Sequence, residues 1–289
     1  MLSALAEEPL APPAARQFGE MVGERLARKP VQYIIGEWSF LELNLLVRAP
    51  VLVPRPETEE LVELALARCP ALARDAPRAA CVLDVGCGTG AIGLAVLHRR
   101  PAARCTAIDV GAEAVALAGE NARALGLADR YEVRLQPIQC LGFSALASAA
   151  SIGDSARSRE SSSAGEEQEE RYDVLLSNPP YIPEADMATL EPEVERWEDR
   201  RALCGGADGM DVVVAILERA RSLLRGPGCE VWLEVDPSHP PLIRAWAEAH
   251  AEARLEVVEV VEDFGGLERF IRLRLTAGKL SAVGSPTLS

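Results

Sequence analysis

The sequence predicts an α/β fold with a seven-stranded, mostly parallel sheet. From residue 80 onward, short apolar runs typical of buried strands alternate with longer segments whose apolar residues recur at helical spacing. A glycine-rich turn follows the first of these strands, and an Asn-Pro-Pro-Tyr segment follows a later one. Parallel strands end at one edge of a sheet, where ligands bind in open α/β folds. We therefore expect both segments to belong to one site.

The chain before this alternation is predicted to contribute two small elements. Residues 1–30 contain a short helical pattern that includes Phe18 and Leu26. Residues 31–56 alternate as a β-hairpin linker does, with Tyr33 and Ile35 on its first strand.

The main domain is predicted to span residues 57–275. Its first helix, near 57–66, carries acidic residues in its first turn, as the helix dipole favours. Strands are then expected near 80–85, 104–109, 131–136, 172–177, 229–235, 255–261 and 268–275. Helices are expected near 90–100, 111–125, 209–225 and 239–250. A serine- and glutamate-rich stretch, 147–170, is predicted to be a disordered insertion, and 276–289 a flexible tail.

The glycine-rich turn is typical of a nucleotide site. It consists of Gly86, Cys87, Gly88, Thr89 and Gly90. Glycines permit tight backbone angles and a close approach of the backbone to a ligand. The GxGxG spacing is neither the GxGxxG of dinucleotide sites nor a Walker loop, and such turns also serve packing. Cys87 is more simply explained as a small filler than as a catalytic thiol.

Asp109 ends the next strand, about twenty residues past the glycines, where a carboxylate can bind both hydroxyls of a ribose. The alternative role is an N-cap for the helix that begins near Gly111.

The Asn-Pro-Pro-Tyr segment suits the binding of a flat group that carries NH2. Two prolines after a buried strand end its backbone hydrogen bonding and restrict the backbone where the chain leaves the strand. The side-chain oxygen of Asn178 and the carbonyl of Pro179 can each accept one N–H, while the Tyr181 ring covers the group. A plain surface turn is the alternative interpretation.

Composition narrows the possible functions. A net charge of −14 is unfavourable for binding nucleic-acid backbones and suits a basic partner. Seven cysteines without a CxxC pattern predict reduced, buried thiols, and three scattered histidines predict no metal site. We also expect no membrane span and a monomer.

The motifs together resemble the HemK/PrmC family of protein-glutamine methyltransferases, over roughly residues 28–275. The resemblance is carried by residues 30–40, 51–59, 86–90, 178–181, 205–211 and 233–236. It implies a class I S-adenosylmethionine-dependent methyltransferase domain with a Rossmann-like sheet, whose last strand runs antiparallel and is inserted before the sixth. Family members methylate the glutamine of the Gly-Gly-Gln loop in class I peptide chain release factors.

The resemblance also implies roles for individual residues. S-adenosyl-L-methionine is the expected cofactor, bound by the glycine turn, Asp109 and Asn178. The expected catalytic residues are Asn178, Pro179 and Tyr181. Substrate-binding roles fall to Asn178, Pro179, Pro180, Tyr181, Arg55 and Glu57. The resemblance places the Arg-Pro-Glu-Thr corner at 55–58 beside the active site, and the alternative is that Pro56 and Glu57 only start a helix. The Gln136-Pro137-Ile138 stretch lacks the acidic or aromatic residue usual near the adenine, so no adenine contact is assigned.

Several alternatives stay open at this stage. An enzyme that methylates amino groups of adenine or guanine shares the Asn-Pro-Pro-Tyr segment, and a ribosomal protein is another possible glutamine substrate. An inactive cofactor-binding scaffold is the third. The helical part before residue 31 is shorter than is usual in the family, which indicates a short form or a start further upstream. A mitochondrial location is expected, with the cytoplasm as the alternative, although Glu7 and Glu8 are unusual for a transit peptide.

Overall fold

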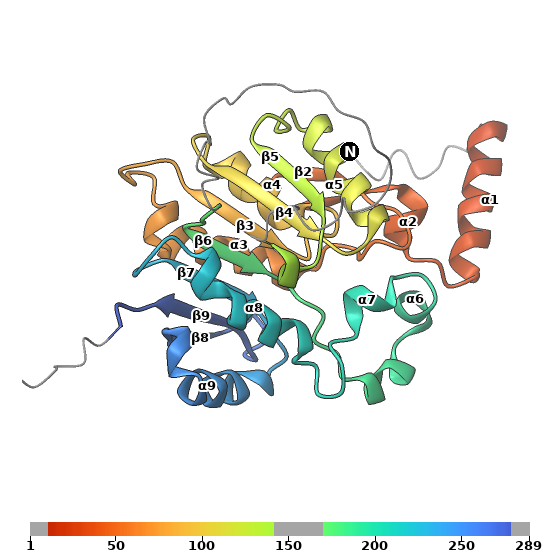
Figure 1. Ribbon diagram of the computed structural model, residues 1–289. Helices are drawn as coiled ribbons and strands as arrows, with labels where there is room; N and C mark the ends of the chain where they lie inside the picture. The colour runs from red at the N-terminus through yellow and green to blue at the C-terminus, as the bar shows by residue number, and fades with distance from the viewer. Residues whose placement is uncertain (1–10, 142–169, 279–289) are drawn as a thin grey trace, which may run out of the picture.

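The computed structural model describes residues 11–141 and 170–278. Its centre is a seven-stranded sheet with the order β5-β4-β3-β6-β7-β9-β8 (Figure 1). The strands are β3 (Cys81–Val85), β4 (Arg104–Asp109), β5 (Tyr131–Leu135), β6 (Val174–Ser177), β7 (Glu230–Glu234), β8 (Leu255–Glu262) and β9 (Glu268–Leu275). The first five pair in parallel, and β9 runs antiparallel between β7 and β8. The predicted sheet is confirmed.

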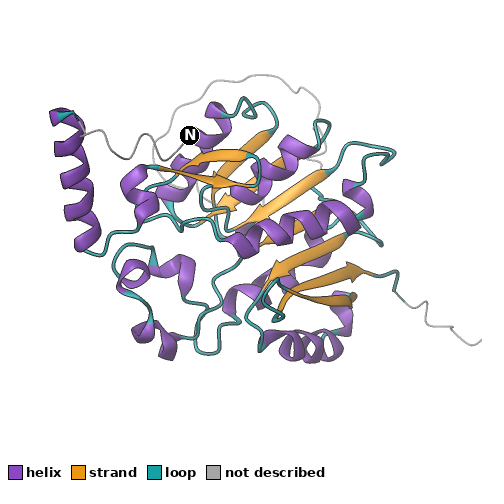
Figure 2. Cartoon of the chain, turned by 180° about the vertical axis from the view of Figure 1, so that it is seen from behind, coloured by secondary structure: helices purple, strands orange, loops and turns teal. Residues whose placement is uncertain are grey.

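Helices cover both faces of the sheet (Figure 2). One face packs against α3 (Pro56–Arg68), α4 (Ala91–Arg99) and α5 (Ala112–Ala124), and the other against α8 (Asp211–Leu223) and α9 (His239–Ala249). Val82 joins the core on the first face and Leu83 the core on the second, because successive side chains of a strand point to opposite sides. Burial on both faces explains why the central strands β3, β6 and β7 are largely apolar, whereas the edge strands β5 and β8 are partly exposed and carry charged residues.

The N-terminal part differs from the predicted hairpin. Tyr33 and Ile35 lie in a short helix, α2 (Val31–Ile35), and the hairpin comprises β1 (Glu37–Phe40) and β2 (Leu43–Leu46). Five apolar-rich residues do not distinguish helix from strand by periodicity. The helix ends because Gly36 adopts a left-handed conformation with φ of 86°. The Tyr33 hydroxyl then donates to the Val51 carbonyl at 2.6 Å.

The hairpin is part of the main core. Phe40, Leu43 and Leu45 are buried in the same cluster as Leu61 and Leu94. Helix α1 (Pro12–Leu26), by contrast, buries none of its residues and stands apart from the sheet (Figure 1).

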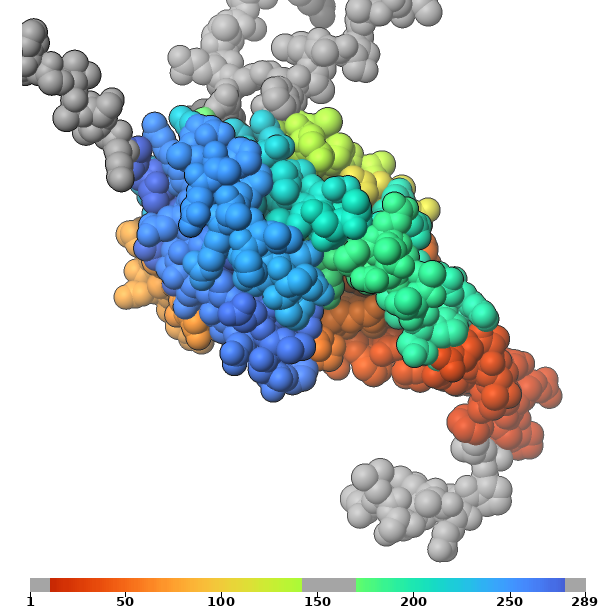
Figure 3. Space-filling model, turned by 90° about the horizontal axis from the view of Figure 1, so that it is seen from below, coloured from red at the N-terminus to blue at the C-terminus, as the bar shows by residue number. Residues whose placement is uncertain are grey.

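An excursion between β6 and α8 completes the carboxyl edge of the sheet. It contains the 3-10 helix η3 (Glu184–Thr189), α6 (Pro192–Glu195) and α7 (Arg200–Leu203). The other 3-10 helices are η1 (Pro70–Leu72), η2 (Ile138–Cys140) and η4 (Ala251–Ala253). Arg25 pairs with Glu193 at 2.6 Å, and Figure 3 shows the green surface of the excursion beside the red-orange N-terminal surface.

Other expectations meet the structure only in part. The predicted insertion over 147–170 lies outside the described residues except for Glu170, and the predicted tail does so from residue 279. The seven cysteines are free thiols, but only Cys69, Cys87 and Cys105 are buried. Cys81, Cys204 and Cys229 are half-buried, and Cys140, at the end of the surface turn η2, is exposed. Within residues 11–141 and 170–278, no helix has the length and hydropathy of a membrane span, and no group of three candidate metal ligands occurs.

Candidate active site

A cavity of about 220 Å³ lies at the carboxyl ends of β3, β4 and β6. The glycine turn, Asp109, Asn178 and residues 136–139 line it, and the segments 50–52 and 199–202 close it from the other side. Sheet topology explains this convergence, since β3 is central and the order of the strands reverses beside it.

Two residues of the glycine turn face the cavity. Gly86 and Gly88 line it with φ of 70° and 55°, which a side chain rarely adopts. A Cβ atom built on Gly86 would meet nothing within 4 Å, so this glycine borders open space. Cys87 and Thr89 are instead buried behind the turn.

Gly90 serves packing. A Cβ atom there would approach the Tyr131 hydroxyl to 2.9 Å. Of the turn residues predicted to contact the cofactor, Gly86 and Gly88 line the cavity, whereas Cys87, Thr89 and Gly90 do not. Cys87, Thr89 and Gly90 instead lie against the core, where small residues are required.

The Asp109 carboxylate is fixed by backbone N–H groups. One oxygen accepts from Gly88 at 2.9 Å and the other from Gly111 at 2.8 Å. Gly111 occupies the N-cap position of α5, and no side chain caps the first turn of that helix. Burial raises the pKa of Asp109, and the two N–H groups oppose this effect. The carboxylate thus holds the glycine turn while it faces the cavity.

Asp84 supports the turn from below. It is completely buried, and its carboxylate accepts from the Gly93 N–H at 2.9 Å in the first turn of α4. Burial raises the pKa of Asp84 to about 7.

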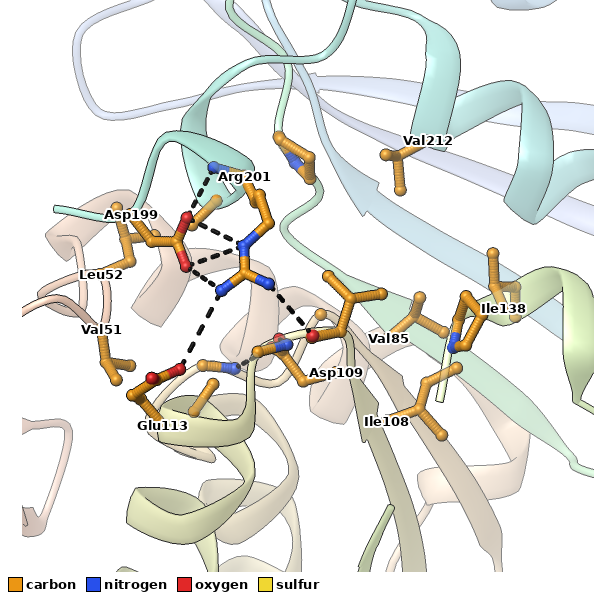
Figure 4. Close-up of a pocket in the computed structure, with 18 of the residues that line it drawn as sticks. Val51, Leu52, Val85, Ile108, Asp109, Glu113, Ile138, Asp199, Arg201 and Val212 are labelled. Atoms are coloured by element: carbon orange, nitrogen blue, oxygen red, sulfur yellow. Dashed lines mark hydrogen bonds and ion pairs between the residues drawn. The ribbon is translucent and has the colours of Figure 1, made fainter. Parts of the chain in front are cut away.

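The two ends of the cavity differ in polarity. Figure 4 shows Ile108, Ile138 and Val212 at one end, and charged side chains at the other. There Arg201 pairs with Asp199 at 2.6 Å and reaches toward the Val110 carbonyl at 3.4 Å.

Sequence reasoning assigned no role to these lining residues. Single apolar residues that follow different strands form no sequence motif by which a cavity wall could be predicted. The Gln136-Pro137-Ile138 stretch, left without a role, also lines the cavity.

A second cavity, of about 170 Å³, shares lining residues of the Asn-Pro-Pro-Tyr segment with the first. Asn178 and Pro180 line both cavities, whereas Pro179 and Tyr181 line the second. Within the described residues, no hydrogen bond uses the side-chain oxygen of Asn178 or the carbonyl of Pro179. Among the described residues both predicted acceptors are therefore unpaired, with Asn178 on the wall of both cavities and Pro179 on the wall of the second.

The nitrogen end of Asn178 is engaged. Its Nδ2 donates to the Thr58 hydroxyl at 2.9 Å, and that hydroxyl donates to the Glu234 carboxylate at 2.7 Å. The Tyr181 hydroxyl reaches the other oxygen of Glu234 at 3.4 Å. Thr58 and Glu234 belong to the motifs that carry the resemblance but were not among the predicted site residues.

Arg55 lines the second cavity, but a carboxylate already holds its guanidinium. The pair with Glu198 measures 2.5 Å, and the Glu198 side chain is only 1% exposed. Burial raises the pKa of Glu198, and the charge of Arg55 opposes this. Glu57, at the start of α3, borders neither cavity. The structure therefore brings Arg55 to the predicted site and leaves Glu57 outside it.

Two glycines of the loop before α8 support the Asn-Pro-Pro-Tyr turn. A Cβ atom on Gly205 would lie 2.6 Å from the Pro180 carbonyl oxygen, and one on Gly209 would lie 2.2 Å from that of Tyr181. Real Cβ atoms do not approach so closely, so this backbone contact requires glycine.

Comparisons with known proteins agree with this geometry. Residues 69–139 match the methyltransferase small domain, and residues 2–36 match the PrmC N-terminal domain. A solved human methyltransferase 10 domain containing protein shares the fold, with a TM-score of 0.52 and 17% identity. That match covers 80% of this chain and 88% of the other.

Curated relatives are more similar in sequence. The MTRF1L release factor glutamine methyltransferase of Homo sapiens is 38% identical over 94% of this chain and 75% of that protein. The release factor glutamine methyltransferase of Cereibacter sphaeroides is 39% identical over 93% and 83%. With this identity over most of both chains, the protein belongs to the family of release factor glutamine methyltransferases.

Proposed function

We propose that this protein transfers the methyl group of S-adenosyl-L-methionine to the side-chain nitrogen of the glutamine in the Gly-Gly-Gln motif of a class I peptide chain release factor. The position of Asn178 on the wall of both cavities is the observation that carries the proposal. One cavity suits a cofactor and the other a substrate side chain, and the residue between them offers a free amide oxygen.

The first cavity fits the cofactor chemically. Gly86 borders open space, and the Asp109 carboxylate at the end of β4 suits the two hydroxyls of a ribose. The apolar wall for an adenine ring is formed by Ile108, Ile138 and Val212. S-adenosyl-L-methionine, when bound, supplies an electrophilic methyl group on a positively charged sulfur. The chain itself binds the cofactor and the glutamine side chain, orients them toward each other and shields them from solvent.

The second cavity fits a glutamine amide. An amide nitrogen is a weak nucleophile because its lone pair is shared with the carbonyl. The oxygens of Asn178 and Pro179 would each accept one of its hydrogens and hold the nitrogen in line with the methyl group. Orientation of this kind lowers a barrier by about 7–11 kcal/mol at most.

The same acceptors stabilise positive charge on the nitrogen as the new N–C bond forms and the S–C bond breaks. One amide proton then leaves to water. The Tyr181 ring, on the wall of the second cavity, covers the amide and excludes solvent. A net charge of −14 favours a basic substrate protein.

Methyl transfer from labelled cofactor to purified release factors tests the proposal. We expect label in the wild-type release factor and none in a variant whose loop glutamine is replaced by asparagine. Label in ribosomal protein or nucleic acid, with none in the release factor, would refute it. The mitochondrial location stays a prediction, which imaging of the tagged full-length protein would check.

A further inference from the structure

Thr58 joins two groups that lie far apart in sequence. Its hydroxyl contacts Asn178, 120 residues away, and Glu234, 176 residues away. Thr58 is 5% exposed and Glu234 is 1% exposed, so water does not substitute for these contacts. Helix α3, the end of β6 and the end of β7 each supply one member of this chain of hydrogen bonds.

The chemistry of a hydroxyl fixes the direction of the chain. A threonine hydroxyl has one proton, and an ionised carboxylate only accepts. When Thr58 donates to Glu234, its oxygen is left to accept, and Asn178 satisfies it only with its NH2 group. The Asn178 oxygen then points away from Thr58, and Asn178 lines both cavities. A flipped amide would place two acceptors against each other.

We propose that Thr58, held by Glu234, is a positioning residue that sets the carboxamide of Asn178 with its oxygen toward the substrate. The proposal rests on the proposed function, in which that oxygen accepts a hydrogen from the glutamine amide. Thr58 touches neither substrate nor cofactor in this account. Its effect passes through the orientation of Asn178.

The surroundings of Glu234 make this chain of hydrogen bonds depend on pH. Thr58 from α3 and Tyr181 from the Asn-Pro-Pro-Tyr segment form hydrogen bonds with the carboxylate. The charges of Glu57 on α3 and Arg269 on β9 also act on it. Burial raises the pKa of Glu234 to about 7, partly offset by the Thr58 hydrogen bond and the charge of Arg269.

Protonation of Glu234 would exchange donors and acceptors along the hydrogen bonds that join Glu234, Thr58 and Asn178. A protonated Glu234 can donate to Thr58, whose own proton is then free to turn to the Asn178 oxygen and compete with the substrate. We therefore expect kcat to fall as the pH falls through about 7.

Thr58→Val removes the hydroxyl at nearly constant shape. We expect kcat to fall by about 10-fold or more, as for a lost buried hydrogen bond, with little change in the KM for the release factor. Calorimetric affinity for S-adenosylhomocysteine should be unchanged, because Thr58 does not line the first cavity. Thr58→Ser should recover most of the rate, since it restores the hydroxyl.

A matched control is Thr276→Val, which removes a hydroxyl whose partner is the Arg254 carbonyl, far from the site. A Thr58→Val enzyme with control-like kcat, or a Thr58→Ser enzyme as slow as Thr58→Val, would overturn the positioning role. Failure of the wild-type protein to methylate any release factor would instead overturn the proposed function.

Glu234→Gln provides a test that does not depend on the Thr58 variants. The glutamine retains an oxygen that accepts from Thr58 but does not titrate. We expect its kcat to stay nearly constant between about pH 6 and pH 8, where the wild-type kcat changes with the charge of a group of pKa about 7. If kcat of Glu234→Gln varied with pH as kcat of the wild-type enzyme does, Glu234 would not be the group that orients Thr58.

Discussion

Replacement of Gly209 by alanine should impair catalysis from outside the cavities. A Cβ atom at this position would lie 2.2 Å from the Tyr181 carbonyl oxygen and 2.9 Å from the His239 ring. His239 is buried, so the Asn-Pro-Pro-Tyr segment is the part that must move, by about 1 Å. A displacement of this size at a catalytic group lowers kcat by roughly 100-fold.

Backbone strain must be separated from this clash. Gly209 has φ of +82°, where alanine costs about 1–2 kcal/mol in stability. Gly228→Ala is the matched control, because Gly228 has φ of +91° and a Cβ atom there would meet nothing within 4 Å. Both variants should show this loss of stability in thermal unfolding.

Steady-state methyl transfer to a release factor distinguishes the two variants. Gly209→Ala should be about 100-fold slower than Gly228→Ala, while both bind S-adenosylhomocysteine with wild-type affinity in calorimetry. A kcat of Gly209→Ala within about threefold of the control would show that the loop before α8 does not hold the Asn-Pro-Pro-Tyr segment in place.

Two further variants test the cavities directly. Asn178→Ala should lower kcat by roughly 100-fold, more than it raises the Kd of the cofactor, because one acceptor for the reacting amide is lost. Near-normal turnover on a Gly-Gly-Gln substrate would show that this acceptor is dispensable. Asp109→Ala should raise the Kd of S-adenosylhomocysteine by about 10-fold or more, through lost ribose contacts and the two freed N–H groups of Gly88 and Gly111. Calorimetry with unchanged affinity would remove Asp109 from the cofactor site.

Local pattern was sufficient for the central strands β3, β6 and β7 because they are buried on both faces. Uninterrupted apolar runs such as Val174–Ser177 need no partner to be recognised, and the glycine turn and Asn178 were placed by their position after such runs. The short segment around Tyr33 was misassigned since five residues carry no distinct period. Its conformation depends on the Gly36 stop and on the contact of Tyr33 with Val51.

The sequence by itself determined the order of the elements, the glycine turn and the two acceptors on the segment that begins at Asn178. Only the tertiary structure decided which side chains surround them: Thr58 and Glu234 at the amide of Asn178, and Glu198 on Arg55. Periodicity and turn chemistry act over a few residues. Contacts between residues more than 100 positions apart depend instead on the strand order that brings the ends of β6 and β7 together beside α3.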